Sequence, residues 1–236
     1  MIFYSPLPIL SELKILIVFA TATESGIMKE ISDGYQGRDG FLIGGSEINV
    51  LVTGIGGVQT AWSMKQWLCE NQRPDLIINA GIAGSFREGF KKGEVVMPVS
   101  DCFADMGIET GDRYLTLAET GLVDADEFPF RQGIIYCENK YSEKICKLVK
   151  PVKAITVNTT SGTEATIEKL TNKFNPDIET MEGATFFYIC ARENISFLAL
   201  RAISNMVVPG RADKWEIPLA LENLAEKMKE VFKILL

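Results

Sequence analysis

Residues 76–85, LIINAGIAGS, join a short apolar run directly to a segment of small residues. An apolar run of this length, ending at Ala80, predicts a strand that is buried on both faces, as in parallel or mixed sheets. The segment from Gly81 to Ser85 then predicts a turn at the carboxyl end of that strand. Because ligands of open α/β sheets bind at the carboxyl ends of strands, this turn is a candidate wall of a binding site.

Strand and helix patterns alternate on both sides of this stretch. Apolar runs predict strands at residues 14–19, 94–99, 154–157 and 196–203, and a hairpin over 41–53 that turns at Gly44 and Gly45. Helical spacing predicts helices at 24–31, from the glycines of 54–57 to about 71, and at 163–174, 183–192 and 215–236. We place Trp62, Trp67 and Leu68 on an apolar stripe of the second helix. The alternation predicts a single-domain, three-layer α/β/α fold with a central mixed β-sheet over residues 1–236, of which 1–13 form an N-terminal extension.

Composition excludes several classes of function. The chain has 236 residues, a net charge of −7 and no histidine. The acidic balance argues against a nucleic-acid-binding protein. The lack of histidine excludes a Ser-His-Asp or Cys-His apparatus and histidine-based zinc sites. Acid–base chemistry must then depend on Asp, Glu, Lys, Tyr or water.

The remaining signals concern location and partners. No apolar run reaches the roughly 20 residues of a membrane span, and the first ten residues do not resemble a secretory signal. Five scattered cysteines, without a CxxC pair, are typical of a reducing compartment, so we expect a cytoplasmic protein. The polar segment 101–131 predicts irregular structure and is too long for a simple connection, which indicates a lid or an interface.

Three polar residues follow predicted strands or interrupt apolar stretches. Glu24 comes shortly after the first strand, where a helix-start acid is the structural alternative to a catalytic one. Glu182 stands in a mostly apolar stretch, where an acid is costly without a partner. Asn205 follows an apolar strand, where it could also cap a turn. The glycine-rich segment 54–57 resembles a phosphate-binding loop, but the lysine and the glycine spacing of a P-loop are absent. A tight turn is therefore the simpler interpretation.

Three motifs together resemble one known family. They are Ile77-x-Asn79-Ala80-Gly81-x-x-Gly84, Thr180-Met181-Glu182-Gly183-Ala184 and Arg201-Ala202-Ile203-Ser204-Asn205, in the order and spacing of the purine nucleoside phosphorylase / methylthioadenosine nucleosidase superfamily. The resemblance runs from about Lys14 to the C-terminus. It implies a nucleoside phosphorylase-like fold, a small-molecule nucleoside as substrate, and a mechanism that requires no metal and no cofactor. It also implies a homo-oligomer, which we expect to be a dimer.

The resemblance also implies roles for individual residues. Glu24 matches the glutamate that holds the attacking water, and Met181 and Glu182 match the pair that binds the ribose hydroxyls. The family residues that contact the purine base correspond in this chain to Ala83, Gly84, Thr160 and Ser161. The alignment is looser for the last two.

One departure concerns the leaving base. Adenosine-directed nucleosidases of the family carry an aspartate where this chain has Asn205. An asparagine is no general acid at neutral pH, but its NH₂ group donates hydrogen bonds. A 6-oxopurine presents acceptors at O6 and N7, so Asn205 favours hypoxanthine or guanine over adenine.

A second departure concerns the nucleophile. Phosphorylases of the family hold phosphate with an arginine shortly after the first strand, whereas residues 21–27 here contain Glu24 and no arginine. A carboxylate repels phosphate, so water is the expected nucleophile.

Together the features resemble the futalosine hydrolases of menaquinone biosynthesis, which release hypoxanthine. Arg87 and Arg211 are then candidates for binding the distal carboxylate of the substrate, with surface ion pairs as their structural alternative. A methylthioadenosine/adenosylhomocysteine nucleosidase, or a nucleoside-binding protein without turnover, are the alternatives.

Overall fold

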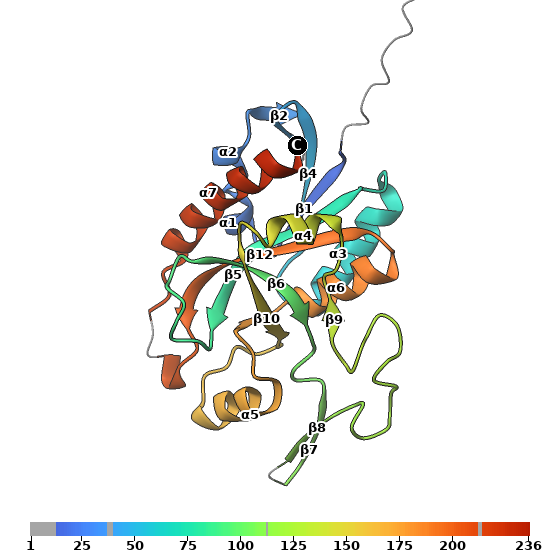
Figure 1. The fold of residues 1–236 in the computed structure, drawn as a ribbon, viewed down its shortest axis with the longest axis vertical. Coiled ribbons are helices and arrows are strands. Elements are labelled where there is room, and N and C mark those ends of the chain that lie inside the picture. The colour runs from blue at the N-terminus through green and yellow to red at the C-terminus, as the bar shows by residue number, and fades with distance from the viewer. Residues whose placement is uncertain (1–12, 37–39, 112, 212–213) are drawn as a thin grey trace, which may run out of the picture.

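The computed structural model describes residues 13–36, 40–111, 113–211 and 214–236, apart from the side chains of residues 35, 36 and 211. Its main sheet is mixed, and its strands lie in the order β11-β10-β6-β12-β5-β1-β4-β3-β2, with β9 paired to β6 (Figure 1). The strands of this sheet are β1 (Ile15–Phe19), β2 (Gly34–Gln36), β3 (Gly40–Ile43), β4 (Ser46–Val52), β5 (Leu76–Ser85), β6 (Val95–Asp101), β9 (Ile135–Tyr136), β10 (Lys150–Thr156), β11 (Ile178–Thr180) and β12 (Ser196–Met206).

Helices cover both faces of the sheet. They are α1 (Ala22–Ser25), α2 (Met28–Ile31), α3 (Gly57–Glu70), α4 (Lys140–Ile145), α5 (Glu164–Phe174), α6 (Gly183–Arg192) and α7 (Ile217–Leu235). Helix α7 packs against β12, β5, α2 and α4, whereas α3 and α6 pack against each other on the other face. The predicted mixed sheet with helices on its two sides is therefore confirmed.

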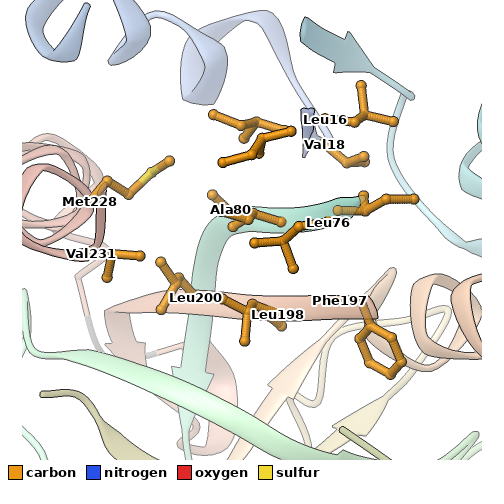
Figure 2. Packing of buried hydrophobic residues seen from close by; sticks show 14 of the residues in the cluster. Leu16, Val18, Leu76, Ala80, Phe197, Leu198, Leu200, Met228 and Val231 are labelled. Carbon is orange, nitrogen blue, oxygen red and sulfur yellow. The ribbon is translucent and has the colours of Figure 1, made fainter. Parts of the chain in front are cut away.

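The core lies between the central strands and these helices. Strands β1, β5 and β12 are buried along almost their whole length, as their continuous apolar runs predict. Figure 2 shows Met228 and Val231 of α7 facing Leu198 and Leu200 of β12 across this core. Helix α7 is long and amphipathic, and its buried stripe holds it against the sheet.

A second pairing of β11 gives the sheet its shape near the site. Strand β11 runs parallel to β10 and also pairs antiparallel with β5, through Glu179 and Gly84. The strands β5, β12, β6, β10 and β11 therefore form a closed ring. The carboxyl end of β5 is held on both sides, by β12 and by β11.

Four expectations need correction. Residues 81–85 are not a turn but the second half of β5, because β12 and β11 supply hydrogen-bonding partners for them. The helix expected over 24–31 is divided into α1 and α2 around Gly26 and Ile27. Trp62 of α3 is 72% exposed and lies outside the core. Within the segment 101–131, the hairpin of β7 (Gly107–Thr110) and β8 (Arg113–Thr116) is regular structure.

Candidate active site

A cavity of about 330 Å³ opens at the carboxyl ends of β1, β5, β11 and β12. It is large enough for a small ligand. Seven of the eight residues that the sequence nominates line it, from five separate parts of the chain. They are Glu24, Ala83, Gly84, Thr160, Met181, Glu182 and Asn205.

Glu24 is buried at the start of α1, where it forms a capping box with Thr21. The Thr21 hydroxyl accepts a hydrogen bond from the Glu24 N–H at 3.2 Å. In return, Glu24 Oε2 accepts from the backbone N–H and the hydroxyl of Thr21, each at 2.9 Å. The backbone N–H of Ile82 donates to the other oxygen, Oε1, at 3.2 Å. The carboxylate is thus oriented by three donors before any ligand arrives.

Gly81 allows this carboxylate to lie against β5. A methyl group on Gly81 would come 2.7 Å from Glu24 Oε1, which is closer than a normal contact. The family motif therefore needs glycine here for space beside a functional side chain.

Glu182 precedes α6 and is held by the glycine segment that precedes α3. The backbone N–H of Gly56 donates to Glu182 Oε1 at 2.8 Å. Gly56 has a φ of 89°, a conformation that glycine adopts at little cost. The glycine segment before α3 thus supplies a hydrogen bond to a carboxylate, and an anion such as phosphate would meet a negative charge at that point.

Arg201 is a buried cation among the acids of the site. Its guanidinium donates to the Asn79 carbonyl at 2.8 Å and also to the Asn79 side-chain oxygen. Burial lowers the pKa of Arg201, while Glu182 and Glu24 oppose that shift. Burial in turn raises the pKa of Glu182, which the Gly56 N–H and Arg201 counteract. The positive charge of Arg201 thus favours the ionised form of Glu182 in a site of low dielectric.

A bulge aims Asn205 into the cavity. On β12, Ile203 pairs with Ala83 and Asn205 with Gly84, so Ser204 is an extra residue in that strand. The Ser204 hydroxyl lies 2.8 Å from Asn205 Oδ1, to which it donates. Asn205 Nδ2 donates one hydrogen to the Met206 carbonyl at 3.2 Å. With its oxygen engaged, the amide presents N–H as its remaining polar group.

Thr160 and Ser161 separate in the structure. Thr160 lines the cavity, as do Ala83 and Gly84 of β5. Ser161 is buried behind the lining, and its backbone N–H donates to Glu179 Oε1 at 3.0 Å. Ser161 is not among the residues that line the cavity, and the contact between Ser161 and the base that the resemblance implies stays a prediction.

Arg87 and the described residues of the segment 101–131 are not part of the cavity wall. Arg87 pairs with Asp177, Nε to Oδ1 at 3.0 Å, and is not part of the cavity wall. The side chain of Arg211 lies outside the described part of the chain. Among the described residues, none of the segment 101–131 lines this cavity; it borders a separate one of about 580 Å³. In the same described residues, no group of three or more Cys, Asp or Glu side chains is placed to hold a metal ion.

Sequence reasoning assigned no role to three residues beside the site. Thr21 was detectable, since Thr-x-x-Glu before an apolar run is the capping-box signature. Arg201 was also detectable, because a single cation in an apolar strand needs buried partners. Glu179 gave no comparable signal, because its place depends on the long-range pairing of β11 with β5.

Comparison with known proteins identifies the family. Residues 27–236 match the model of the phosphorylase superfamily. The chain belongs to this family. Among its curated relatives in the phosphorylase superfamily, the futalosine hydrolase of Streptomyces coelicolor is 27% identical over 192 residues, covering 79% of each chain. The 5'-methylthioadenosine/S-adenosylhomocysteine nucleosidase of Geobacillus sp. is 29% identical over 171 residues, covering 70% of each chain.

Solved structures agree on the fold of this superfamily. The methylthioadenosine/S-adenosylhomocysteine nucleosidase of Streptococcus pneumoniae, in complex with 8-aminoadenine, superposes with a TM-score of 0.77 at 20% identity, covering 94% of this chain and 99% of the other. The corresponding enzyme of Neisseria meningitidis, in complex with methylthio-immucillin-A, gives 0.76 at 16% identity with the same coverage. The nucleoside phosphorylase-like fold is confirmed, and the curated relatives support the prediction of an N-glycosyl hydrolase acting as a nucleosidase.

Proposed function

We propose that this protein hydrolyses the N-ribosidic bond of futalosine and releases hypoxanthine, a step of menaquinone biosynthesis. The observation that carries the proposal is the orientation of Asn205. Its side-chain oxygen accepts a hydrogen bond from Ser204, and its Nδ2 would lie 3.2 Å from a methyl group placed on Gly84 of the cavity wall. An N–H donor matches O6 and N7 of a 6-oxopurine, whereas the amino group of adenine opposes it. The futalosine hydrolase of Streptomyces coelicolor is among the relatives.

The proposed mechanism assigns each carboxylate one task. Glu182, held by the Gly56 N–H, accepts hydrogen bonds from the ribose hydroxyls and stabilises positive charge as the C1′–N9 bond breaks. The base leaves with the bonding electrons while Asn205 donates to it, and solvent supplies its proton. Glu24 accepts a proton from water as the water oxygen bonds to C1′. Met181 packs against the ribose, and Ala83, Gly84 and Thr160 surround the base.

Water rather than phosphate is the nucleophile in this proposal. The cavity wall near the ribose end carries Glu24 and Glu182, and these two negative charges disfavour an anionic nucleophile. Arg201 is committed to Asn79, which reduces its capacity to bind a phosphate.

A panel of nucleosides tests the proposal. Purine release is measured from futalosine, inosine, methylthioadenosine and adenosylhomocysteine, each with and without phosphate. We expect hypoxanthine from futalosine at a rate that does not depend on phosphate. Adenine release would favour the alternative, a methylthioadenosine/adenosylhomocysteine nucleosidase. The similarity to the nucleosidase of Geobacillus sp. supports that alternative. A strict need for phosphate would make the protein a phosphorylase, and binding without release would make it a nucleoside-binding protein.

We also infer a homodimer in the cytoplasm. Val58 and Trp62 of α3 are 83% and 72% exposed and lie in a groove with Tyr188 of α6. Large exposed apolar side chains gathered in one place are typical of a protein interface. The five cysteines are free thiols, in keeping with a reducing compartment. Within the described residues, no helix is long and apolar enough to cross a membrane.

A further inference from the structure

Asp101 is a buried acid beside the candidate site that the proposed mechanism does not use. It is the last residue of β6, is 1% exposed and is not among the residues that line the cavity. Burial raises the pKa of Asp101 to about 7, a shift that Glu182 reinforces and that the Thr156 hydroxyl and Arg201 oppose. A buried carboxyl group is costly unless other groups pair with it.

One hydroxyl joins Asp101 to the first turn of α6. The Thr156 hydroxyl donates to Asp101 Oδ1 at 3.0 Å, and it accepts from the backbone N–H of Ala184 at 2.7 Å. Asp101 and Thr156 end two neighbouring parallel strands, β6 and β10. Because a hydroxyl that donates to a carboxylate becomes a better acceptor, Asp101 strengthens the hydrogen bond that holds Ala184.

The second oxygen of Asp101 lies against Gly183. A methyl group on Gly183 would collide with Asp101 Oδ2, and it would come 2.8 Å from the Thr180 hydroxyl oxygen. That hydroxyl accepts from the Gly183 N–H at 3.1 Å. Among the described residues, Asp101 Oδ2 has no hydrogen-bond partner. Gly183 thus leaves the space that the Asp101 carboxyl group fills beside the start of the helix.

Glu182 is the N-cap residue of α6, but its side chain does not cap the helix. The first N–H groups of a helix need acceptors from outside the helix. The hydroxyls of Thr180 and Thr156 supply them for the first two N–H groups of α6. The Glu182 carboxylate is therefore released from capping and lines the cavity.

We propose that Asp101 and Thr156 are positioning residues, which fix the first turn of α6 and thereby set where the Glu182 carboxylate meets the ribose hydroxyls. The inference rests on the proposed function, since it assumes that Glu182 binds the ribose. It adds two residues that do not line the cavity and act through the backbone that carries Glu182.

Binding of C-nucleosides tests the inference without turnover, because their carbon–carbon ribosidic bond resists hydrolysis. Calorimetry on the full-length protein compares formycin B, an inosine analogue, and formycin A, an adenosine analogue, with the free bases hypoxanthine and adenine. We expect Asp101→Ala and Thr156→Val each to weaken binding of the preferred C-nucleoside by roughly 10- to 100-fold, the range for a hydrogen bond to a charged group. Binding of the corresponding free base, which has no ribose, should not change.

Matched variants separate positioning from a loss of stability. Thr156→Ser keeps the hydroxyl and should keep wild-type binding of the C-nucleoside. Ser142→Ala removes a buried hydroxyl from the capping box of α4, a helix that does not line the cavity. We expect it to lower the melting temperature without changing the ratio of C-nucleoside to base affinity. The double variant Asp101→Ala/Thr156→Val should bind no more weakly than the weaker single variant, because the two residues form one chain.

Glu182→Gln separates this inference from the proposed function. If it weakens C-nucleoside binding while folded Asp101→Ala and Thr156→Val variants do not, or if those two weaken the free base equally, the inference is overturned and the role of Glu182 stands. If Glu182→Gln has no effect, the proposed role of Glu182 falls, and the inference with it. A preference for formycin A contradicts the release of hypoxanthine alone.

Folding of the variants does not limit the test. Where one of Asp101→Ala and Thr156→Val does not fold, the other decides. Where neither folds, Asp101→Asn decides, because it keeps an oxygen for the Thr156 hydroxyl but removes the charge that polarises it. This variant then has to weaken the C-nucleoside and not the base, and unchanged affinities overturn the inference.

Discussion

At the scale of the residue, the carboxylate of Glu24 has both a structural and a proposed catalytic role. It caps α1 through Thr21 and also faces the cavity. Glu24→Gln keeps the size and one acceptor oxygen but removes the base, so we expect kcat to fall by about 10²–10⁴-fold with little change in KM. Steady-state kinetics on the substrate found in the panel measures this. Glu30→Gln, at an exposed acid of α2, is the control. A fully active Glu24→Gln variant would remove Glu24 from the mechanism.

The sequence carried most of the information at this scale. The positions of Glu24, Glu182 and Asn205 follow from what comes after each strand, and all three line one cavity. Their orientation did not follow, because it depends on contacts with Ile82, Gly56 and other residues distant in sequence. Ser161 shows the limit, since its place behind the residues that line the cavity does not follow from the local sequence.

At the scale of the element, strand β5 sets the distance between the sheet and α1. Gly81→Ala would place a methyl group 2.7 Å from Glu24 Oε1. Because the carboxylate is the end of a side chain, we expect it to move while the fold persists. Misplacement of a reacting group by about 1 Å costs on the order of 10²-fold in rate. Gly89→Ala, which meets nothing within 4 Å, should leave kcat unchanged. In a Glu24→Gln background the Gly81→Ala change should cost almost nothing more, and additive losses would contradict this reasoning.

Element boundaries were predicted well where local signals are strong. Helix α6 and the cap of α5 at Thr163 agree with the sequence pattern. The extension of β5 to Ser85 was missed, because small residues without strand propensity pair there with β12 and β11. Tertiary pairing overrides local preference at that point.

At the scale of the whole molecule, the exposed groove of α3 and α6 predicts the state of assembly. We expect a dimer by sedimentation velocity, and Trp62→Glu should shift it towards the monomer, because a charge would be buried in the interface. Ile234→Glu, at a 41% exposed position of α7, is the matched control and should leave the dimer intact. A wild-type protein that sediments as a monomer, or a Trp62→Glu variant that stays dimeric, would contradict the interface. Helical spacing itself indicates the exposure of Trp62, because at about 100° per residue it stands on the opposite side of α3 from the buried residues Thr60 and Met64.

The ring of strands that β11 closes has a consequence for how the molecule opens. At the far end of the sheet, β2 is the last strand and pairs there with β3. We therefore expect the β2–β3 hairpin to have the lowest free energy of local opening in the sheet. In the ring, opening one strand means breaking ladders on two sides. The candidate site is thus built into the part of the sheet that we expect to exchange last with solvent, and transient fraying of the β2–β3 hairpin leaves the walls of the cavity in place.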